Sequence, residues 1–188
     1  MTIITFKPGA NTDDSFADSS GTLQDVASLE IGRLSDARRT FFRFPNFNIP
    51  KESTINSVTL TLRGNGARND AIHIYIKAVA ADNQLAPADR AALFALGLTV
   101  AVSALWEFTL ATDTNFTSPS FASVIQEIVN RSGWVAGNAL ALVSYDNGAT
   151  NDYGGVYSFN ASSTYCATLE VDFTEPPGRM MQLPSFIG

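Results

Sequence analysis

The sequence predicts an all-β protein, a jelly-roll-type antiparallel β-sandwich with two short helices. Several short segments alternate apolar and polar residues with a period of two, as half-buried strands do. Residues that favour turns separate these segments, and only two segments show a helical period. The length of 188 residues suits one domain. We expect the sandwich over residues 1–175 and an extension over residues 176–188.

The first strands are expected around a turn-rich N-terminal stretch. Residues 2–6 and 29–31 are short strand candidates. Residues 40–44 read Thr-Phe-Phe-Arg-Phe, and the two-residue period places Phe42 and Phe44 on one face and Phe41 and Arg43 on the other.

The clearest alternation lies in residues 57–63, and a second lies in residues 71–79. A Gly-Asn-Gly sequence at residues 64–66 separates them, so we expect the two strands to pair antiparallel. The apolar positions that should face the core are Val58, Leu60 and Leu62 in the first strand and Ile72, Ile74 and Ile76 in the second. The outward positions of the second strand are His73, Tyr75 and Lys77.

Two helices are expected. Residues 87–96 begin with Pro87 and are followed by Gly97, the usual asymmetry of helix ends. Residues 118–131 form the stronger candidate, with Ser118 as the N-cap and Glu127 and Arg131 spaced to form an ion pair on the exposed side. The apolar stripe of this helix consists of Phe121, Val124, Ile125, Ile128 and Val129.

Three further strands are expected at residues 139–144, 156–160 and 168–174, with a long polar loop at residues 145–155. The extension beyond the last strand is rich in apolar side chains, which mark interfaces when they are exposed. We therefore expect it to be a docking arm that uses Arg179, Met180, Met181, Leu183, Phe186 and Ile187.

Composition restricts the class of protein. Apolar residues make up 45% and charged residues 16%, so the chain can bury a sizeable core. The net charge of −6 argues against nucleic acid as a partner, because phosphate binding needs a positive face. No run approaches the ~20 apolar residues of a membrane helix, and the N-terminus has no signal-peptide pattern. We expect synthesis in a cytoplasm and no membrane partner. The single cysteine, Cys166, is expected to pack in the core.

Candidate catalytic and metal-binding residues are few. His73 is the only histidine and sits in mid-strand, which favours a surface imidazole over a catalytic base, and we expect no enzyme activity. Calcium prefers six to eight oxygen ligands. A structural calcium ion at Asp13, Asp14 and Asp18 is one interpretation of these residues, and ordinary turn chemistry is the other. No other cofactor is expected.

Exposed aromatic residues beside amides would suit a glycan. Trp106 and Trp134 follow apolar elements and are expected in the core. The glycan candidates are therefore Tyr145, Asn151, Asp152, Tyr153 and Tyr157.

The run from residue 126 to 140, Gln-Glu-Ile-Val-Asn-Arg-Ser-Gly-Trp-Val-Ala-Gly-Asn-Ala-Leu, resembles a segment of DNRLRE-type β-sandwich domains, which are similar to carbohydrate-binding-module jelly rolls. Residues 29–32 with 39–44, residues 49–62, and residues 157–160 with 167–173 resemble other strands of that family in the same order. The resemblance covers nearly all of residues 10–174.

The resemblance implies a non-enzymatic jelly roll of extracellular surface proteins or bacteriophage virions. We expect a virion structural protein, a capsid or tail decoration, cement or adaptor subunit, assembled in the host cytoplasm and bound to other virion proteins and to copies of itself. The alternative is a carbohydrate-binding module for a cell-surface polysaccharide, acting at the extracellular surface.

Overall fold

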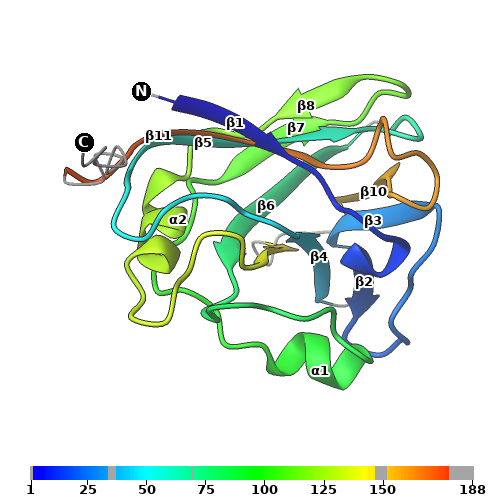
Figure 1. Ribbon diagram of the computed structural model, residues 1–188. Coiled ribbons are helices and arrows are strands. Elements are labelled where there is room, and N and C mark those ends of the chain that lie inside the picture. Colours follow the sequence, from blue (N-terminus) through cyan, green and yellow to red (C-terminus); the bar gives the residue numbers. More distant parts are fainter. Residues whose placement is uncertain (1, 34–36, 69, 147–151, 178–188) are drawn as a thin grey trace, which may run out of the picture.

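The computed structural model describes residues 2–33, 37–68, 70–146 and 152–177, and its strands form two layers with a core between them (Figure 1). One layer is a four-stranded sheet in the order β1-β11-β5-β8, and the other is a five-stranded sheet in the order β2-β4-β9-β6-β7. A two-stranded ribbon, β10-β3, accompanies them, and every pair is antiparallel. The predicted all-β sandwich is confirmed.

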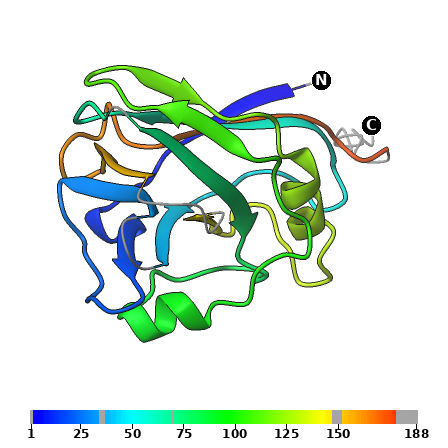
Figure 2. The same ribbon diagram turned by 180° about the vertical axis from the view of Figure 1, so that it is seen from behind.

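The four-stranded sheet consists of β1 (Thr2–Phe6), β11 (Thr168–Thr174), β5 (Thr54–Arg63) and β8 (Asn115–Thr117). The five-stranded sheet consists of β2 (Asp14–Asp18), β4 (Arg38–Phe44), β9 (Leu140–Asp146), β6 (Ala71–Ala78) and β7 (Trp106–Thr109). The ribbon consists of β3 (Ser28–Arg33) and β10 (Asp152–Tyr157). The first and last strands of the chain, β1 and β11, pair with each other, so the N-terminal and C-terminal segments of the domain lie side by side in one sheet (Figure 2).

The core between the layers follows from the alternation in the strands. In β5, Val58, Leu60 and Leu62 are buried, and in β6 every second residue from Ile72 is buried, as predicted. Trp106 and Trp134 are also buried, and the indole N–H of Trp134 donates to the carbonyl of Ile49 at 3.0 Å. Burial of this many apolar side chains is the main favourable contribution to the fold.

A second, smaller core lies on the outer face of the five-stranded sheet. Phe41 and Val143 point away from the main core, yet both are fully buried. They pack with Leu93 of α1 (Arg90–Ala95), which covers this part of the sheet (Figure 1). The sheet is therefore apolar on both faces where α1 lies over it.

The predicted pairing of the strands at 57–63 and 71–79 is wrong, because β5 and β6 belong to different sheets. β5 pairs with β11 and β8, and β6 pairs with β9 and β7. The connection crosses between the layers, and its backbone is tied to other segments: Asn65 N–H donates to the Gly155 carbonyl and Arg68 N–H to the Leu110 carbonyl. The inward faces of both strands meet the same core from opposite sides, so the alternation alone could not distinguish the two arrangements.

Both helices are shorter than predicted. In α1, the carboxylate of Asp89 accepts the N–H of Ala92 at 2.7 Å, so the helix begins after Asp89 instead of at Pro87. In α2 (Ala122–Val129), Phe121 is the N-cap, because the hydroxyl of Ser118 instead accepts the N–H of Leu60 at 3.0 Å.

The apolar stripe of α2 is buried as predicted, but its expected surface ion pair is absent from the described contacts. The carboxylate of Glu127 accepts the N–H groups of Val100 and Ala101 at 3.0 and 2.9 Å. Arg131 instead pairs with Asp82, with Nε and Oδ1 2.6 Å apart. Glu127 and Arg131 therefore each bind a group outside the helix instead of each other.

The remaining differences concern short elements. The alternation did not predict β2, β7 or β8, and β10 begins at Asp152, four residues before the predicted start of that strand. Cys166 is buried, as predicted, and its thiol donates to the Ser163 carbonyl at 3.4 Å. No helix in the described part of the chain has the length and apolar character to cross a bilayer. The residues of the predicted docking arm lie outside the described residues, apart from Pro176 and Pro177.

Candidate functional site

The outer face of the five-stranded sheet carries a row of three large side chains beside α1. Arg39 of β4 is opposite Tyr145 of β9, and Tyr145 is opposite Tyr75 of β6. Residues directly opposite in antiparallel strands have side chains on the same face, within contact distance. The two tyrosine rings lie with centroids 5.8 Å apart and planes inclined by 33°. The register of three strands therefore fixes a cation and two aromatic rings in one line.

Two neighbouring hollows in the surface lie along this row of side chains. One, of about 520 Å³, extends from Arg39 and Lys77 to Phe94 and Leu98 near α1. The other, of about 320 Å³, lies between Tyr75 and Val102. Tyr145 and Asp146 line both hollows. We call this surface the tyrosine groove and define it by Arg39, Tyr75, Lys77, Tyr145 and Asp146.

The groove exists because α1 covers only part of the sheet. Lys77 is opposite Val143, and Val143 is opposite Phe41, so this second row runs beside the first. Phe41 and Val143 are buried in the small core with α1, whereas the side chains of Tyr75 and Tyr145 stay partly exposed. The groove therefore lies beside the part of the sheet that packs against α1.

The side chain of Arg39 is held in place by several contacts. Its Nη1 donates to the carbonyls of Leu93 and Phe94 at 3.3 and 3.0 Å, and its guanidinium carbon lies 4.9 Å from the centre of the Phe94 ring. Burial lowers the pKa of Arg39. An arginine that already has a fixed orientation loses little side-chain entropy when it binds a ligand.

Burial raises the pKa of Tyr145, and the neighbouring Tyr75 adds to this effect while Arg39 opposes it. The phenol of Tyr145 therefore stays protonated at neutral pH and can donate a hydrogen bond. With the aromatic faces, two cations and the carboxylate of Asp146, the groove can stack on an apolar ring face and hydrogen-bond to hydroxyl groups. These are the elements of a binding site.

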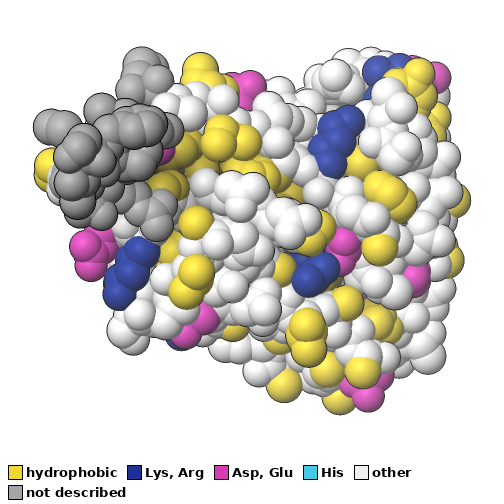
Figure 3. Space-filling model, viewed as in Figure 1, with side chains coloured by type: hydrophobic (Ala, Val, Ile, Leu, Met, Phe, Trp, Pro, Cys, Tyr) yellow, Lys and Arg dark blue, Asp and Glu magenta, His cyan; other side chains and the backbone are white. Residues whose placement is uncertain are grey.

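The face of the molecule shown in Figure 3 is weakly charged, because lysine, arginine and acidic side chains are scattered there among uncharged ones. This face agrees with the low charge content of the sequence.

The three tyrosines predicted to bind a glycan contact different residues. Tyr145 lies in the tyrosine groove. The ring of Tyr153 on β10 contacts two guanidinium groups, with the central carbons of Arg38 and Arg68 5.3 and 4.5 Å from its centre. Tyr157 packs its ring 5.6 Å from Tyr165 and donates its hydroxyl proton to Asp113 at 3.2 Å. Asn151 and the side chain of Asp152 lie outside the described residues.

The groove residues that sequence reasoning missed are Arg39, Tyr75, Lys77 and Asp146. The alternation did place Tyr75 and Lys77 on the outward face of their strand. The missing information was the register, because only the order β4-β9-β6 brings Tyr75 beside Tyr145.

The carboxylates predicted to bind calcium are only partly brought together. Asp13 accepts the N–H of Gly9 at 2.9 Å and pairs with Arg43 at 2.6 Å. Asp14 is adjacent to it, fully buried, and accepts the N–H of Phe159 at 2.8 Å. Asp18 is four residues further along β2, about 13 Å away at the usual rise per strand residue.

Asp18 instead accepts the N–H groups of Ser20 and Gly21 in a turn. Within the described ranges, no three His, Cys, Asp or Glu side chains form a group that could hold a metal ion. His73 lies on the partly exposed face of β6, where its Nε2 is 3.3 Å from a carboxylate oxygen of Glu107 on β7.

A comparison of the chain with models of known protein families found no match, and a comparison with curated proteins found none either.

Proposed function

We propose that this protein is a non-enzymatic β-sandwich module that binds a cell-surface polysaccharide through the tyrosine groove. The observation that carries the proposal is the row Arg39–Tyr145–Tyr75, which the strand register holds in line on a partly exposed sheet face. An extended sugar chain has apolar ring faces that pack on aromatic rings and hydroxyl groups that need hydrogen-bond partners. The groove supplies both kinds of contact over two adjacent hollows.

Rigidity supports this proposal. The groove side chains arise from three paired strands, so their backbone is already ordered before a ligand binds. Sites built on strands keep their geometry better than sites on loops. A ligand that binds there does not need to order the protein, and more of the contact energy appears as affinity.

The test is a glycan array followed by calorimetric titration of any polysaccharide that binds. Tyr75→Ala and Tyr145→Ala should each weaken binding about tenfold, which corresponds to about 1.4 kcal/mol per ring. Val135→Ala is the control, because Val135 is an exposed residue in the turn after α2 and lies outside the groove. The proposal fails if the array shows no binding, or if the two groove variants bind as tightly as the control.

A second candidate function is a structural subunit of a bacteriophage particle, assembled in the host cytoplasm and displayed on the virion. The resemblance to DNRLRE-type domains supports it, and so does an exposed apolar segment before β7. Val100, Val102 and Leu105 are 88%, 41% and 38% exposed, and apolar groups that gather on a surface mark protein interfaces. The segment leads into β7, which over the described residues is the last strand of its sheet, and an edge strand can pair with another chain.

In this second proposal the chain acts by burying complementary surface against other virion proteins or copies of itself. Light scattering on the purified chain, and co-sedimentation with particles, would test it. Val100→Asp should reduce the association, and Val135→Asp is the control, because Val135 is similarly exposed but lies in the turn after α2. A monomer that associates with no particle or neighbouring subunit would contradict it.

A further inference from the structure

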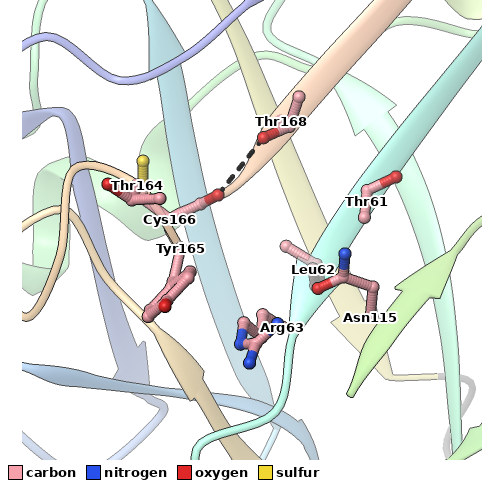
Figure 4. Close-up of a pocket in the computed structure, with 8 residues that line it drawn as sticks. All are labelled: Thr61, Leu62, Arg63, Asn115, Thr164, Tyr165, Cys166 and Thr168. Carbon is pink, nitrogen blue, oxygen red and sulfur yellow. Dashed lines mark hydrogen bonds between the residues drawn. The ribbon is translucent and has the colours of Figure 1, made fainter. Parts of the chain in front are cut away.

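A separate pocket lies on the outer face of the other layer, the four-stranded sheet. It has a volume of about 250 Å³ and is formed by β5, β8, β11 and the segment that leads into β11 (Figure 4). We call it the Arg63 pocket. The polar side chains that line it are Thr61, Arg63, Asn115, Thr164, Tyr165 and Thr168.

The strand register explains why polar groups gather here. Thr61 and Arg63 alternate with the buried Leu60 and Leu62, so they point outward. Arg63 is opposite Asn115 of β8, and Thr61 is opposite Thr168 of β11. Tyr165 reaches the pocket from the preceding segment, and the close-up shows these side chains around one space (Figure 4).

The guanidinium of Arg63 is fixed before any ligand binds. Its central carbon lies 4.3 Å from the centre of the Tyr165 ring, and its Nη2 is 3.4 Å from Oδ1 of Asp113. The hydroxyl of Tyr157 donates to the same oxygen at 3.2 Å, which holds Asp113 in place. The other terminal nitrogen, Nη1, has no hydrogen-bond partner within the described part of the chain.

Other polar groups of the pocket are also uncommitted. Over the described ranges, the amide of Asn115 and the hydroxyls of Thr164 and Tyr165 make no side-chain hydrogen bond. Thr168 is different, since its hydroxyl donates to the Cys166 carbonyl (Figure 4). Polar groups that converge on one space can fix the orientation of a small polar ligand.

The charge of the pocket selects the ligand. Among the described residues, its lining contains one arginine and no carboxylate. A second cation is close, because Nζ of Lys7 donates to the Thr164 carbonyl at 2.8 Å. Asp113 neutralises part of this charge from outside the lining. Guanidinium, amide and hydroxyl donors beside two cationic side chains favour an oxyanion.

We infer that the Arg63 pocket binds the carboxylate or phosphate group of a small ligand, independently of the tyrosine groove. Nη1 of Arg63 donates to one oxygen of the anion, and the amide of Asn115 or the hydroxyl of Tyr165 donates to another. The volume is below the roughly 300–1,000 Å³ of sites for drug-sized ligands. The pocket therefore accepts a small anion or one terminal group of a larger molecule.

Asp113 allows a test in which a substitution should strengthen binding instead of removing a binding group. The carboxylate of Asp113 competes with the bound anion for Arg63 and repels that anion. Asp113 has a φ of 57°, in the left-handed region that asparagine tolerates well, so Asp113→Asn preserves the backbone. A merely structural role of Arg63 predicts no gain in anion binding when Asp113 loses its charge.

The experiment is an NMR titration of the full chain with inorganic phosphate and, separately, with acetate, at constant ionic strength in chloride. The side-chain signals of Arg63 and Asn115 should shift and saturate with at least one of the two anions. Response to phosphate alone identifies a phosphate-bearing ligand, response to acetate alone a carboxylate, and response to both an oxyanion site without that selectivity. Asp113→Asn should tighten binding about threefold to tenfold, and Arg63→Gln should weaken it at least tenfold.

The matched control is Arg68→Gln, which removes an arginine that stacks on Tyr153 instead of Tyr165. It should bind the anion as the unmodified chain does. The inference is overturned if neither anion shifts these signals, if Asp113→Asn leaves the affinity unchanged, or if Arg68→Gln weakens binding as much as Arg63→Gln. Anion binding that persists in Tyr75→Ala would show that the pocket and the groove are independent sites.

Discussion

Replacing Asp14 with asparagine should make the protein more stable at neutral and alkaline pH. Asp14 is fully buried, its Oδ2 accepts the N–H of Phe159, and its Oδ1 has no hydrogen-bond partner within the described residues. Burial, together with the nearby charges of Asp25 and Asp13, raises the pKa of Asp14 from 3.8 to about 7, although the hydrogen bond from Phe159 opposes this.

The sign follows from the protons bound in each state. Between pH 3.8 and about 7 the folded protein keeps the proton on Asp14, whereas the unfolded chain has lost it. The free energy of unfolding therefore falls as the pH rises through this window, and above it the loss is complete. The two pKa values differ by about three, and at about 1.36 kcal/mol per pKa unit the total loss is about 4 kcal/mol.

Urea unfolding of the unmodified chain and of Asp14→Asn, from pH 5 to pH 8.5, measures this effect. The variant cannot ionise and its amide can still accept the N–H of Phe159. Its stability relative to the unmodified chain should therefore grow by about 3 kcal/mol across this range. Titrating groups that do not interact with Asp14 cancel in the difference. The reasoning is refuted if the difference in stability between Asp14→Asn and the unmodified chain does not change with pH.

Three further changes test the packing. Trp134→Phe leaves the buried carbonyl of Ile49 without its donor, and should lower the free energy of unfolding by about 1–3 kcal/mol in urea titrations. Asp89→Ala removes the cap on the Ala92 N–H and should cost about 1 kcal/mol, whereas Asp89→Asn should restore most of it. Phe41→Ala should cost about 3–5 kcal/mol by thermal or urea unfolding, since the second core encloses this ring. A loss below 1 kcal/mol would contradict the enclosure of Phe41.

Local pattern was sufficient for the faces of the strands and for the stripe of α2. Ile72 and Val58 are buried where the two-residue period placed them, and Trp134 is in the core. The local pattern could not predict which strands pair when two different pairings bury the same alternating apolar residues. The strands β5 and β6 could bury their apolar faces as neighbours or as members of opposite sheets, and the chain adopts the second arrangement.

The same limit applies to the sites. Tyr145 was a glycan candidate from the sequence, but its neighbours Tyr75 and Arg39 come from distant segments that only the register brings together. The helix cap could not be predicted from the local sequence either. The hydroxyl of Ser118 could have capped α2, but it accepts the N–H of Leu60 in a strand instead. In each case the choice is made by a tertiary contact that the local sequence does not contain.

NMR mapping of a bound polysaccharide tests the central proposal most directly. A polysaccharide selected on a glycan array is added to the labelled chain, and the shifted backbone and side-chain signals are assigned. The tyrosine groove predicts that the shifts gather on Arg39, Tyr75, Lys77 and Tyr145. Shifts that instead gather away from the outer face of β4, β9 and β6 would contradict it.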